Sequence, residues 1–200
     1  MEEKIQFQSE NLSIQGLISR GQGPRGVVIT HPHPQFGGDM YNPVVESVAH
    51  VYQRQGVTTL RFNFRGVGSS QGSYSDGIGE QEDVLAAIRC LKDNGHEHID
   101  LAGYSFGAWV NAHIDPEATE IITMTMVSPP VAFMGFDDNL SLPRLNLVVS
   151  GSQDDIAPPG RIRSRLQGWN PNATFKEIQG ADHFYFGFFQ ELEAVLSENF

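Results

Sequence analysis

Hydrophobic and polar residues alternate near the start of the chain and then follow other periods. Alternation over residues 4–8 and 12–19 predicts two short strands that pair antiparallel. The compact apolar run over residues 26–30 predicts a buried strand, because both faces of such a strand are covered. Residues 42–56 instead carry apolar side chains at helical spacing and end at a glycine, which predicts a helix.

The same change of period recurs along the rest of the chain. Strands are expected at residues 57–64, 99–104, 121–128, 145–151 and 173–178, and helices at residues 79–95, 108–114, 161–169 and 186–200. This order predicts βαβ units, and therefore an α/β fold whose sheet is mostly parallel, with an antiparallel N-terminal strand pair and helices on both faces. Residues 1–200 are expected to form a single domain, since the chain is short for two cores.

Composition narrows the class of protein and of partner. Hydrophobic residues make up 40% of the chain and charged residues 18%, which is typical of a soluble globular protein. The formal net charge of −11 argues against nucleic acid, because binding to a phosphate backbone requires a basic surface. Residues 1–10 lack the apolar core of a signal peptide, and no segment is long and apolar enough to span a membrane. We therefore expect a cytoplasmic protein with no membrane partner.

The only cysteine, Cys90, cannot form an internal disulfide, which agrees with a reducing compartment. It falls within the helix expected at residues 79–95, where a small buried side chain is the simplest interpretation.

One serine follows the strand expected at residues 99–104, in the sequence GYSFGA. Ser105 stands between Gly103 and Gly107 with the spacing G-x-S-x-G, before an expected helix, which is the context of a nucleophile elbow. Side chains at the two glycine positions would clash with the adjoining strand and helix. The amide of Phe106 lies at the helix N-terminus and is a candidate oxyanion donor. A serine that merely caps the helix is the alternative.

A nucleophilic serine requires a base and a group that orients the base. His183, in GADHFYF, follows the strand expected at residues 173–178, and Asp154, in SGSQDDIAPP, follows the strand expected at residues 145–151. The chain order is therefore serine, acid, base, one of the orders in which such triads occur.

Three other aspartates compete for the role of the acid. Asp154 is preferred over Asp155 because it occupies the aspartate position of the turn that begins at Gly151, and Asp155 is then expected to face solvent. Asp137 and Asp138 follow the preceding strand, where some hydrolases place the acid, and rank well below Asp154.

The loop after residues 26–30, with the sequence THPHPQFGGDM, is expected to supply a second oxyanion amide. Pro32 and Pro34 have no N–H group, which leaves His33 as the first choice and Gln35 as the second.

The sequence HPH in this loop also raises the alternative of a metal hydrolase. His31 and His33 are two residues apart, so in an extended segment both could bind one ion. A metal site requires further ligands at other strand ends, and the sequence offers no second cluster. We therefore predict neither a metal nor another cofactor.

These motifs together resemble the small, cap-less α/β-hydrolases related to the dienelactone hydrolases. The resemblance covers nearly the whole chain, through HPHPQFGGDMYNPVV, RFNFRGVGSSQGSYSDGIGEQEDVLAAI, GYSFGA, SGSQDDIAPP and GADHFYFG. It implies an α/β-hydrolase fold without a cap domain and an esterase-like activity, with Ser105, Asp154 and His183 as nucleophile, acid and base. Dienelactone hydrolases proper use a cysteine at the position of Ser105, so their own reaction is not implied.

The segment FNFRGVGSSQG looks like the loop after the fourth strand of that fold. Its Arg65 is expected to form a structural ion pair with Glu80 or Asp83.

We therefore predict a serine hydrolase that cleaves a small or short-chain ester, a small-molecule acyl substrate, through an acyl-enzyme. Thioesterase, lactonase and peptidase activities use the same groups, and a non-catalytic binding protein of this fold is a further alternative. Residues 128–144 leave room only for a short loop where other hydrolases insert a cap, so the site should be open. Its candidate aromatic walls are Phe36, Tyr104, Phe106, Phe133, Phe136 and Phe184. Residues 183–189 are rich in phenylalanine, and an exposed apolar surface there is a candidate contact for a homodimer.

Overall fold

A central β-sheet organises the chain, which the computed structural model describes over residues 1–115 and 120–200. Eight strands follow the order β1-β2-β4-β3-β5-β6-β7-β8. They are β1 (Glu2–Ser9), β2 (Leu12–Ser19), β3 (Arg25–Thr30), β4 (Thr58–Phe62), β5 (His98–Tyr104), β6 (Ile121–Val127), β7 (Leu145–Gly151) and β8 (Thr174–Ile178). β2 pairs antiparallel with β1 and β4, and all other neighbours are parallel. The predicted architecture of the sheet is confirmed.

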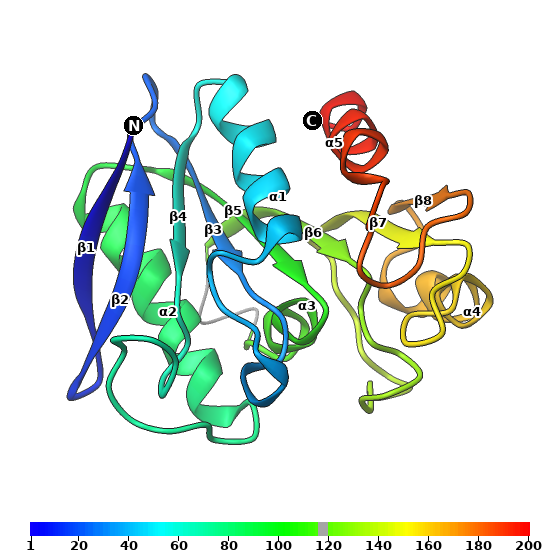
Figure 1. The fold of residues 1–200 in the computed structure, drawn as a ribbon, viewed down its shortest axis with the longest axis horizontal. Helices are drawn as coiled ribbons and strands as arrows, with labels where there is room; N and C mark the ends of the chain where they lie inside the picture. Colours follow the sequence, from blue (N-terminus) through cyan, green and yellow to red (C-terminus); the bar gives the residue numbers. More distant parts are fainter. Residues whose placement is uncertain (116–119) are drawn as a thin grey trace.

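Helices cover both faces of this sheet (Figure 1). α1 (Pro43–Arg54) and α5 (Phe189–Glu198) lie on one face and share a buried cluster with β3 and β7. The other face carries α2 (Ile78–Asp93), α3 (Phe106–Ala112) and α4 (Pro159–Trp169). In the described part of the chain, no helix combines the length and the apolar character needed to cross a bilayer.

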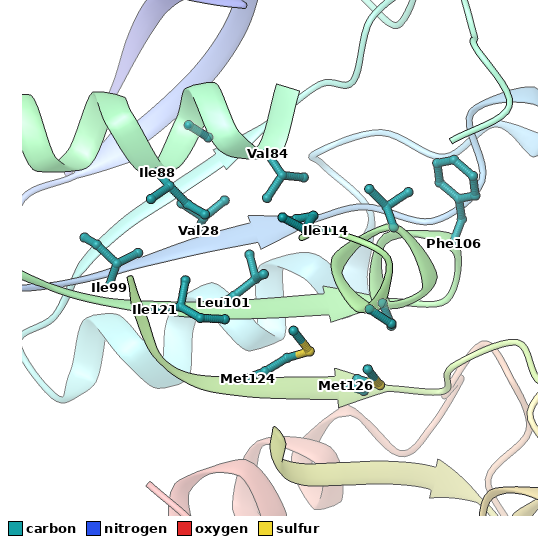
Figure 2. Packing of buried hydrophobic residues seen from close by; sticks show 14 of the residues in the cluster. Val28, Val84, Ile88, Ile99, Leu101, Phe106, Ile114, Ile121, Met124 and Met126 are labelled. Atoms are coloured by element: carbon teal, nitrogen blue, oxygen red, sulfur yellow. The ribbon is translucent and has the colours of Figure 1, made fainter. Parts of the chain in front are cut away.

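Apolar side chains interlock between α2 and the sheet (Figure 2). Val84 and Ile88 are four residues apart on one side of α2, and they belong to one cluster with Val28 of β3 and Leu101 of β5. All four side chains are at most 3% exposed. Burying a side chain of this size stabilises the fold by about 1.5–3 kcal/mol. Cys90 was predicted to be buried. Its side chain is only half-buried and packs at the edge of this cluster.

Three helices begin two or three residues away from the positions that the sequence pattern predicts, and one of them is α4, which begins at Pro159 and not at residue 161. α3 begins at Phe106, directly after Ser105, and not at residue 108. α5 begins at Phe189, and not at residue 186, because Tyr185 and Gly187 have φ angles of 57° and 82°. These left-handed conformations cannot be part of a right-handed helix.

The connection between β6 and β7 contains no helix. Residues 128–144 form only turns and irregular segments, anchored where the Leu142 amide donates to the Trp169 carbonyl at 2.7 Å. The prediction of a fold without a cap domain is therefore confirmed.

The parallel strands end at nearly the same level of the sheet. Thr30 at the end of β3 lies opposite Gly103 of β5, and Tyr104 lies opposite Val127 of β6. Val127 in turn lies opposite Val149 of β7. The loops that follow these strands consequently start side by side along one edge, where ligands of parallel sheets bind.

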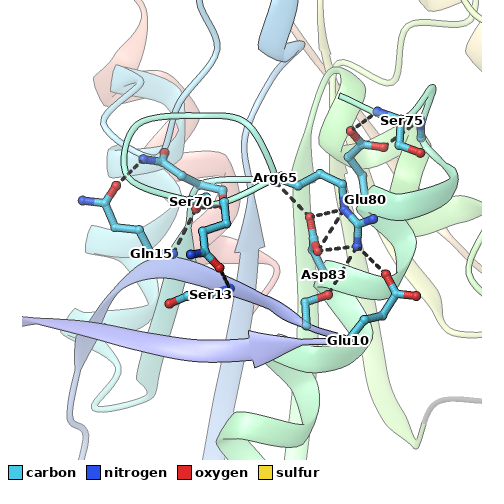
Figure 3. A network of polar contacts seen from close by, with 12 residues as sticks. Glu10, Ser13, Gln15, Arg65, Ser70, Ser75, Glu80 and Asp83 are labelled. Atoms are coloured by element: carbon cyan, nitrogen blue, oxygen red, sulfur yellow. Dashed lines mark hydrogen bonds and ion pairs between the residues drawn. The ribbon is translucent and has the colours of Figure 1, made fainter. Parts of the chain in front are cut away.

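A buried ion pair ties the loop after β4 to α2 (Figure 3). Arg65 Nη2 lies 2.8 Å from Asp83 Oδ1, and the Arg65 amide donates to Asp83 Oδ2 at 2.9 Å. The Asp83 side chain is fully buried, and the Arg65 side chain is 10% exposed. Glu10 adds a longer contact of 3.2 Å from the surface. Asp83 is thus the partner of Arg65, whereas Glu80 accepts hydrogen bonds from loop amides at 2.9 Å.

We expect Asp83→Ala to lower the free energy of unfolding by about 3–5 kcal/mol, because it leaves the Arg65 guanidinium buried without a counter-charge. Urea unfolding of the purified variant measures this loss. Glu10→Ala removes the exposed partner of the same guanidinium and should cost less than about 1 kcal/mol. Equal losses in the two variants would contradict the assignment of Asp83 as the main partner.

Candidate active site

Ser105 occupies a sharp turn between β5 and α3. Its φ of 52° and ψ of −118° lie in a sparsely populated region, which costs a non-glycine residue about 1–3 kcal/mol. A Cβ atom on Gly103 would lie 2.6 Å from the Ala108 amide nitrogen, and one on Gly107 would lie 2.5 Å from Thr30 Oγ1. Both positions therefore require glycine, for the reason predicted from the G-x-S-x-G spacing.

The three residues predicted to act together form one hydrogen-bonded chain. Ser105 Oγ lies 2.9 Å from His183 Nε2. His183 Nδ1 lies 2.9 Å from Asp154 Oδ2 and 3.0 Å from Asp154 Oδ1. All three side chains are buried, with at most 7% of each residue exposed. The arrangement matches the hydrogen-bond pattern of a serine nucleophile, its base and an orienting acid.

Asp154 is held in place by the turn that follows β7. Its Oδ1 accepts hydrogen bonds from the amides of Ile156 at 3.0 Å and Ala157 at 2.7 Å. Burial raises the pKa of the Asp154 carboxyl, but the hydrogen bond and the charge of His183, together with the hydrogen bond from the Ala157 amide, outweigh it and leave the pKa below its usual value. Asp154 is therefore an anion at neutral pH, which keeps the Nδ1 proton on His183.

The competing aspartates lie outside this chain of hydrogen bonds. Asp155 is exposed, as predicted. Asp137 is exposed and accepts the Asn139 amide at 2.8 Å, and the exposed Asp138 contacts Arg165 at 3.4 Å.

His33 and Phe106, the two predicted oxyanion donors, line the same pocket as Ser105. Phe106 is the first residue of α3, so its amide has no partner within the helix. The His33 ring packs against the Phe106 ring with centroids 4.8 Å apart, and its Nε2 lies 3.3 Å from Tyr74 Oη. Gln35 is exposed, and its backbone N–H already donates to His33 Nδ1 at 3.3 Å. His33 therefore stays the first choice for the second oxyanion amide.

His31 has a different environment from His33. It is fully buried, its Nε2 accepts the Phe64 amide at 3.0 Å, and its Nδ1 lies 2.6 Å from the Pro32 carbonyl oxygen. Burial lowers the pKa of His31 to about 4, so the ring is neutral and Nδ1 donates. Binding a metal together with His33 would break one of these hydrogen bonds. Over residues 1–115 and 120–200, no group of three or more potential metal ligands occurs.

A pocket of about 430 Å³ opens over Ser105. Five of the six predicted aromatic walls line it, with Tyr104 and Phe106 buried beneath and three exposed rings above: Phe36, Phe133 and Phe184. Phe136 was expected among them but is buried against Trp169, with ring centroids 5.0 Å apart. Among the described residues that line the pocket, none is Asp, Glu, Lys or Arg.

Three hydroxyl groups beside these residues were not identified from the sequence as polar groups of the site. Tyr104 Oη donates to the His183 carbonyl at 2.8 Å, and Ser128 Oγ lies 2.8 Å from Tyr185 Oη. Their only signal in the sequence is position, because Ser128 directly follows a strand and Tyr185 follows His183 by two residues.

Comparisons with known proteins agree with this geometry. Residues 27–198 match the model of the alpha/beta hydrolase family. The chain belongs to this family. An alpha-beta serine hydrolase homologue from Coxiella burnetii superposes on this hydrolase with a TM-score of 0.91 and 35% identity, covering 98% of this chain and 96% of that chain. A serine hydrolase without lid from Xanthomonas campestris superposes with a TM-score of 0.90 and 26% sequence identity, covering 99% of this chain and 93% of that chain. An uncharacterized protein of Rickettsia prowazekii is 31% identical over 194 residues, 91% of this chain and 82% of that protein.

We expect Gly107→Ala to destabilise this hydrolase by about 1–3 kcal/mol, because the added methyl group displaces the end of β3 at Thr30. Denaturant unfolding measures the change. The matched control is Gly168→Ala in α4, where a Cβ atom meets nothing within 4 Å. This control should be neutral or gain up to about 1 kcal/mol from helix propensity. A neutral Gly107→Ala would show that α3 and β3 do not need their close approach.

Proposed function

We propose that the chain is a serine esterase that cleaves small or short-chain esters through an acyl-enzyme on Ser105. The observation that carries the proposal is the hydrogen-bonded chain from Ser105 through His183 to Asp154, which lies beside an open pocket. The similarity to a serine hydrolase homologue over nearly the whole chain supports the same class of activity.

In the acylation step, His183 Nε2 accepts the proton of Ser105 as the serine oxygen attacks the ester carbonyl. Asp154 holds the imidazole in the tautomer that leaves Nε2 free to accept, and it stabilises the imidazolium that forms. The amides of Phe106 and His33 stabilise the oxyanion. The imidazolium then donates its proton to the leaving alcohol as the ester C–O bond breaks.

In the deacylation step, a water molecule attacks the acyl-enzyme, and His183 accepts a proton from that water. The tetrahedral intermediate collapses, the acid leaves, and the proton returns to Ser105 Oγ. The open pocket gives water a direct path to the acyl group.

The lining of the pocket favours substrates without charge. A charged group that enters would lose its hydration without meeting an opposite charge, which is costly. The exposed rings of Phe36, Phe133 and Phe184 instead offer apolar contact area to an acyl or alcohol group. Thioesters and lactones would react by the same steps, so they belong in the same substrate panel.

We expect Ser105→Ala to abolish labelling by a fluorophosphonate probe and to lower kcat for a short-chain ester by about four to six orders of magnitude. The label on the wild-type protein, located by mass spectrometry, should be confined to Ser105. A well-folded wild-type protein that neither reacts with the probe nor cleaves any ester would overturn the proposal and favour a binding protein.

The two neighbouring aspartates give a matched pair for the same assay. Asp154→Ala should lower kcat by about four orders of magnitude, because His183 loses the group that sets its tautomer. Asp155→Ala removes an exposed carboxylate one residue away and should leave kcat unchanged. Equal losses in the two variants would refute the assignment of the acid.

We expect kcat/KM for a neutral ester to exceed that for its carboxylate analogue by roughly tenfold or more, since the pocket offers no positive charge. Methyl 4-acetoxybenzoate and 4-acetoxybenzoate are a suitable pair. The net charge of −11 also repels anions at long range, but this repulsion is screened at high salt. Met134 lines the pocket, so Met134→Lys adds a positive charge there. A ratio of the two kcat/KM values that persists at high salt and becomes smaller in Met134→Lys would assign the selectivity to the pocket, and a ratio near one would contradict it.

A further inference from the structure

The pocket over Ser105 holds few polar side chains, and most of them already have partners within the protein. Ser105 and His183 are hydrogen-bonded to each other, and Tyr104 Oη donates to the His183 carbonyl oxygen. Among the described residues that line the pocket, the remaining polar side chains are those of His33 and Asn42. These two side chains determine which polar groups of a substrate can be bound away from the reacting ester.

Both ring nitrogens of His33 are engaged. Burial lowers the pKa of the His33 imidazole below its usual value, so the ring is neutral at neutral pH. Its Nδ1 accepts the backbone N–H of Gln35 at 3.3 Å, which places the ring proton on Nε2. Nε2 lies 3.3 Å from Tyr74 Oη and donates to it. The His33 side chain therefore has no further donor or acceptor to offer a substrate.

The side-chain amide of Asn42 is engaged at one end only. Asn42 precedes α1, and its Oδ1 accepts the Val44 amide at 3.0 Å as the cap of this helix. Because a backbone N–H requires an acceptor, this hydrogen bond also distinguishes Oδ1 from Nδ2. With Oδ1 turned toward the helix, the planar amide directs Nδ2 away from it. Within residues 1–115 and 120–200, Nδ2 makes no hydrogen bond to the protein.

We propose that Asn42 Nδ2 is a substrate-binding donor, and that the preferred substrate is an ester with a second, uncharged oxygen acceptor, such as an ether, hydroxyl or carbonyl oxygen. This inference rests on the proposed function and narrows its substrate class. A hydrocarbon ester that covers Asn42 removes Nδ2 from water without giving it a partner, which is unfavourable. A carboxylate also accepts hydrogen bonds, but its charge meets no opposite charge among the described lining residues.

The donor is held in place before any substrate binds. Asn42 lies in the connection between β3 and α1, the same connection that carries His33 and its proposed oxyanion amide. The Asn42 amide donates to the Asp39 carbonyl at 3.2 Å, and the Gly38 amide donates to the His33 carbonyl at 3.0 Å. Since the backbone and Oδ1 of Asn42 are both fixed by hydrogen bonds, little side-chain entropy is lost when Nδ2 binds an acceptor.

Asn42→Ser isolates this donor, because serine also caps helices but carries no Nδ2. The test uses two pairs of esters in which an ether oxygen replaces a methylene group. Methyl methoxyacetate and methyl butanoate differ in the acyl group, and 2-methoxyethyl acetate and butyl acetate differ in the alcohol. The measured quantity is kcat/KM for the ether ester divided by kcat/KM for its hydrocarbon partner. Comparing this ratio between two proteins cancels the intrinsic reactivity of each ester.

For at least one pair, the ratio should be about three- to tenfold lower in Asn42→Ser than in the wild-type protein, because one hydrogen bond is lost. The pair that responds shows whether Nδ2 meets the acyl group or the alcohol. Asn42→Asp keeps the cap and replaces the donor by a carboxylate oxygen, so it should lower the same ratio further. Ratios that are unchanged in Asn42→Ser for both pairs would overturn the inference.

Asn172→Ser is the matched control for the loss of an asparagine amide. Asn172 is exposed and precedes β8, so it lies at the edge of the sheet opposite to the pocket. Both ratios should stay at their wild-type values in this variant. A fall as large as that in Asn42→Ser would also overturn the inference.

A binding measurement separates this inference from the proposed function. Isotope-labelled Ser105→Ala protein is titrated with all four esters, and the side-chain amide resonances of Asn42 are assigned from their absence in Asn42→Ser. These NMR resonances should shift more with an ether ester than with its hydrocarbon partner. Equal shifts within both pairs, or none, would contradict the inference. A wild-type protein that cleaves no ester would refute the proposed function, and the NMR comparison would still decide the role of Asn42.

Discussion

The close approach of α3 to β3 and β5 is the constraint on which the rest of the site depends. Gly103 and Gly107 allow this approach, because a methyl group at either position would overlap backbone or side-chain atoms of the neighbouring element. The approach forces the strained backbone of Ser105 and directs the first turn of α3 toward the pocket. The candidate nucleophile and the candidate oxyanion amide are thus placed by the same packing contact, and the cost of the strain is offset by the buried cores on both faces of the sheet.

Much of the fold could be predicted from the sequence because its signals are local. The strands and helices follow hydrophobic periods and are bounded by capping residues, glycines or loops. At the start of α1, for example, the Asn42 side chain accepts the Val44 amide at 3.0 Å. The late start of α5 has a cause that the hydrophobic period does not show. Gly187, inside the segment predicted as helix, adopts a left-handed conformation, and a single glycine within a helical pattern does not by itself mark a break because helices tolerate it.

The candidate site was predictable where residue type, loop position and chain order agreed, as they do for Ser105, Asp154 and His183. It was less predictable where long-range packing decides a role. Phe133 and Phe136 lie in the same loop after β6, but Phe136 packs on Trp169 and does not line the pocket, whereas Phe133 does. The environments of His31 and His33 differ as strongly. His31 is buried and hydrogen-bonded to backbone groups, whereas His33 lines the pocket. Ser128 and Tyr185 meet only because the strands β6, β7 and β8 end at one edge.

The short connection over residues 128–144 has a consequence for the order of events at the proposed active site. Enzymes with a mobile lid couple substrate entry to a closure step, and this step can limit turnover and complete the catalytic geometry. Here the hydrogen bonds among Ser105, His183 and Asp154 are already formed with the pocket open. Selectivity must then reside in fixed walls, and water competes at every moment with any other nucleophile for the acyl group.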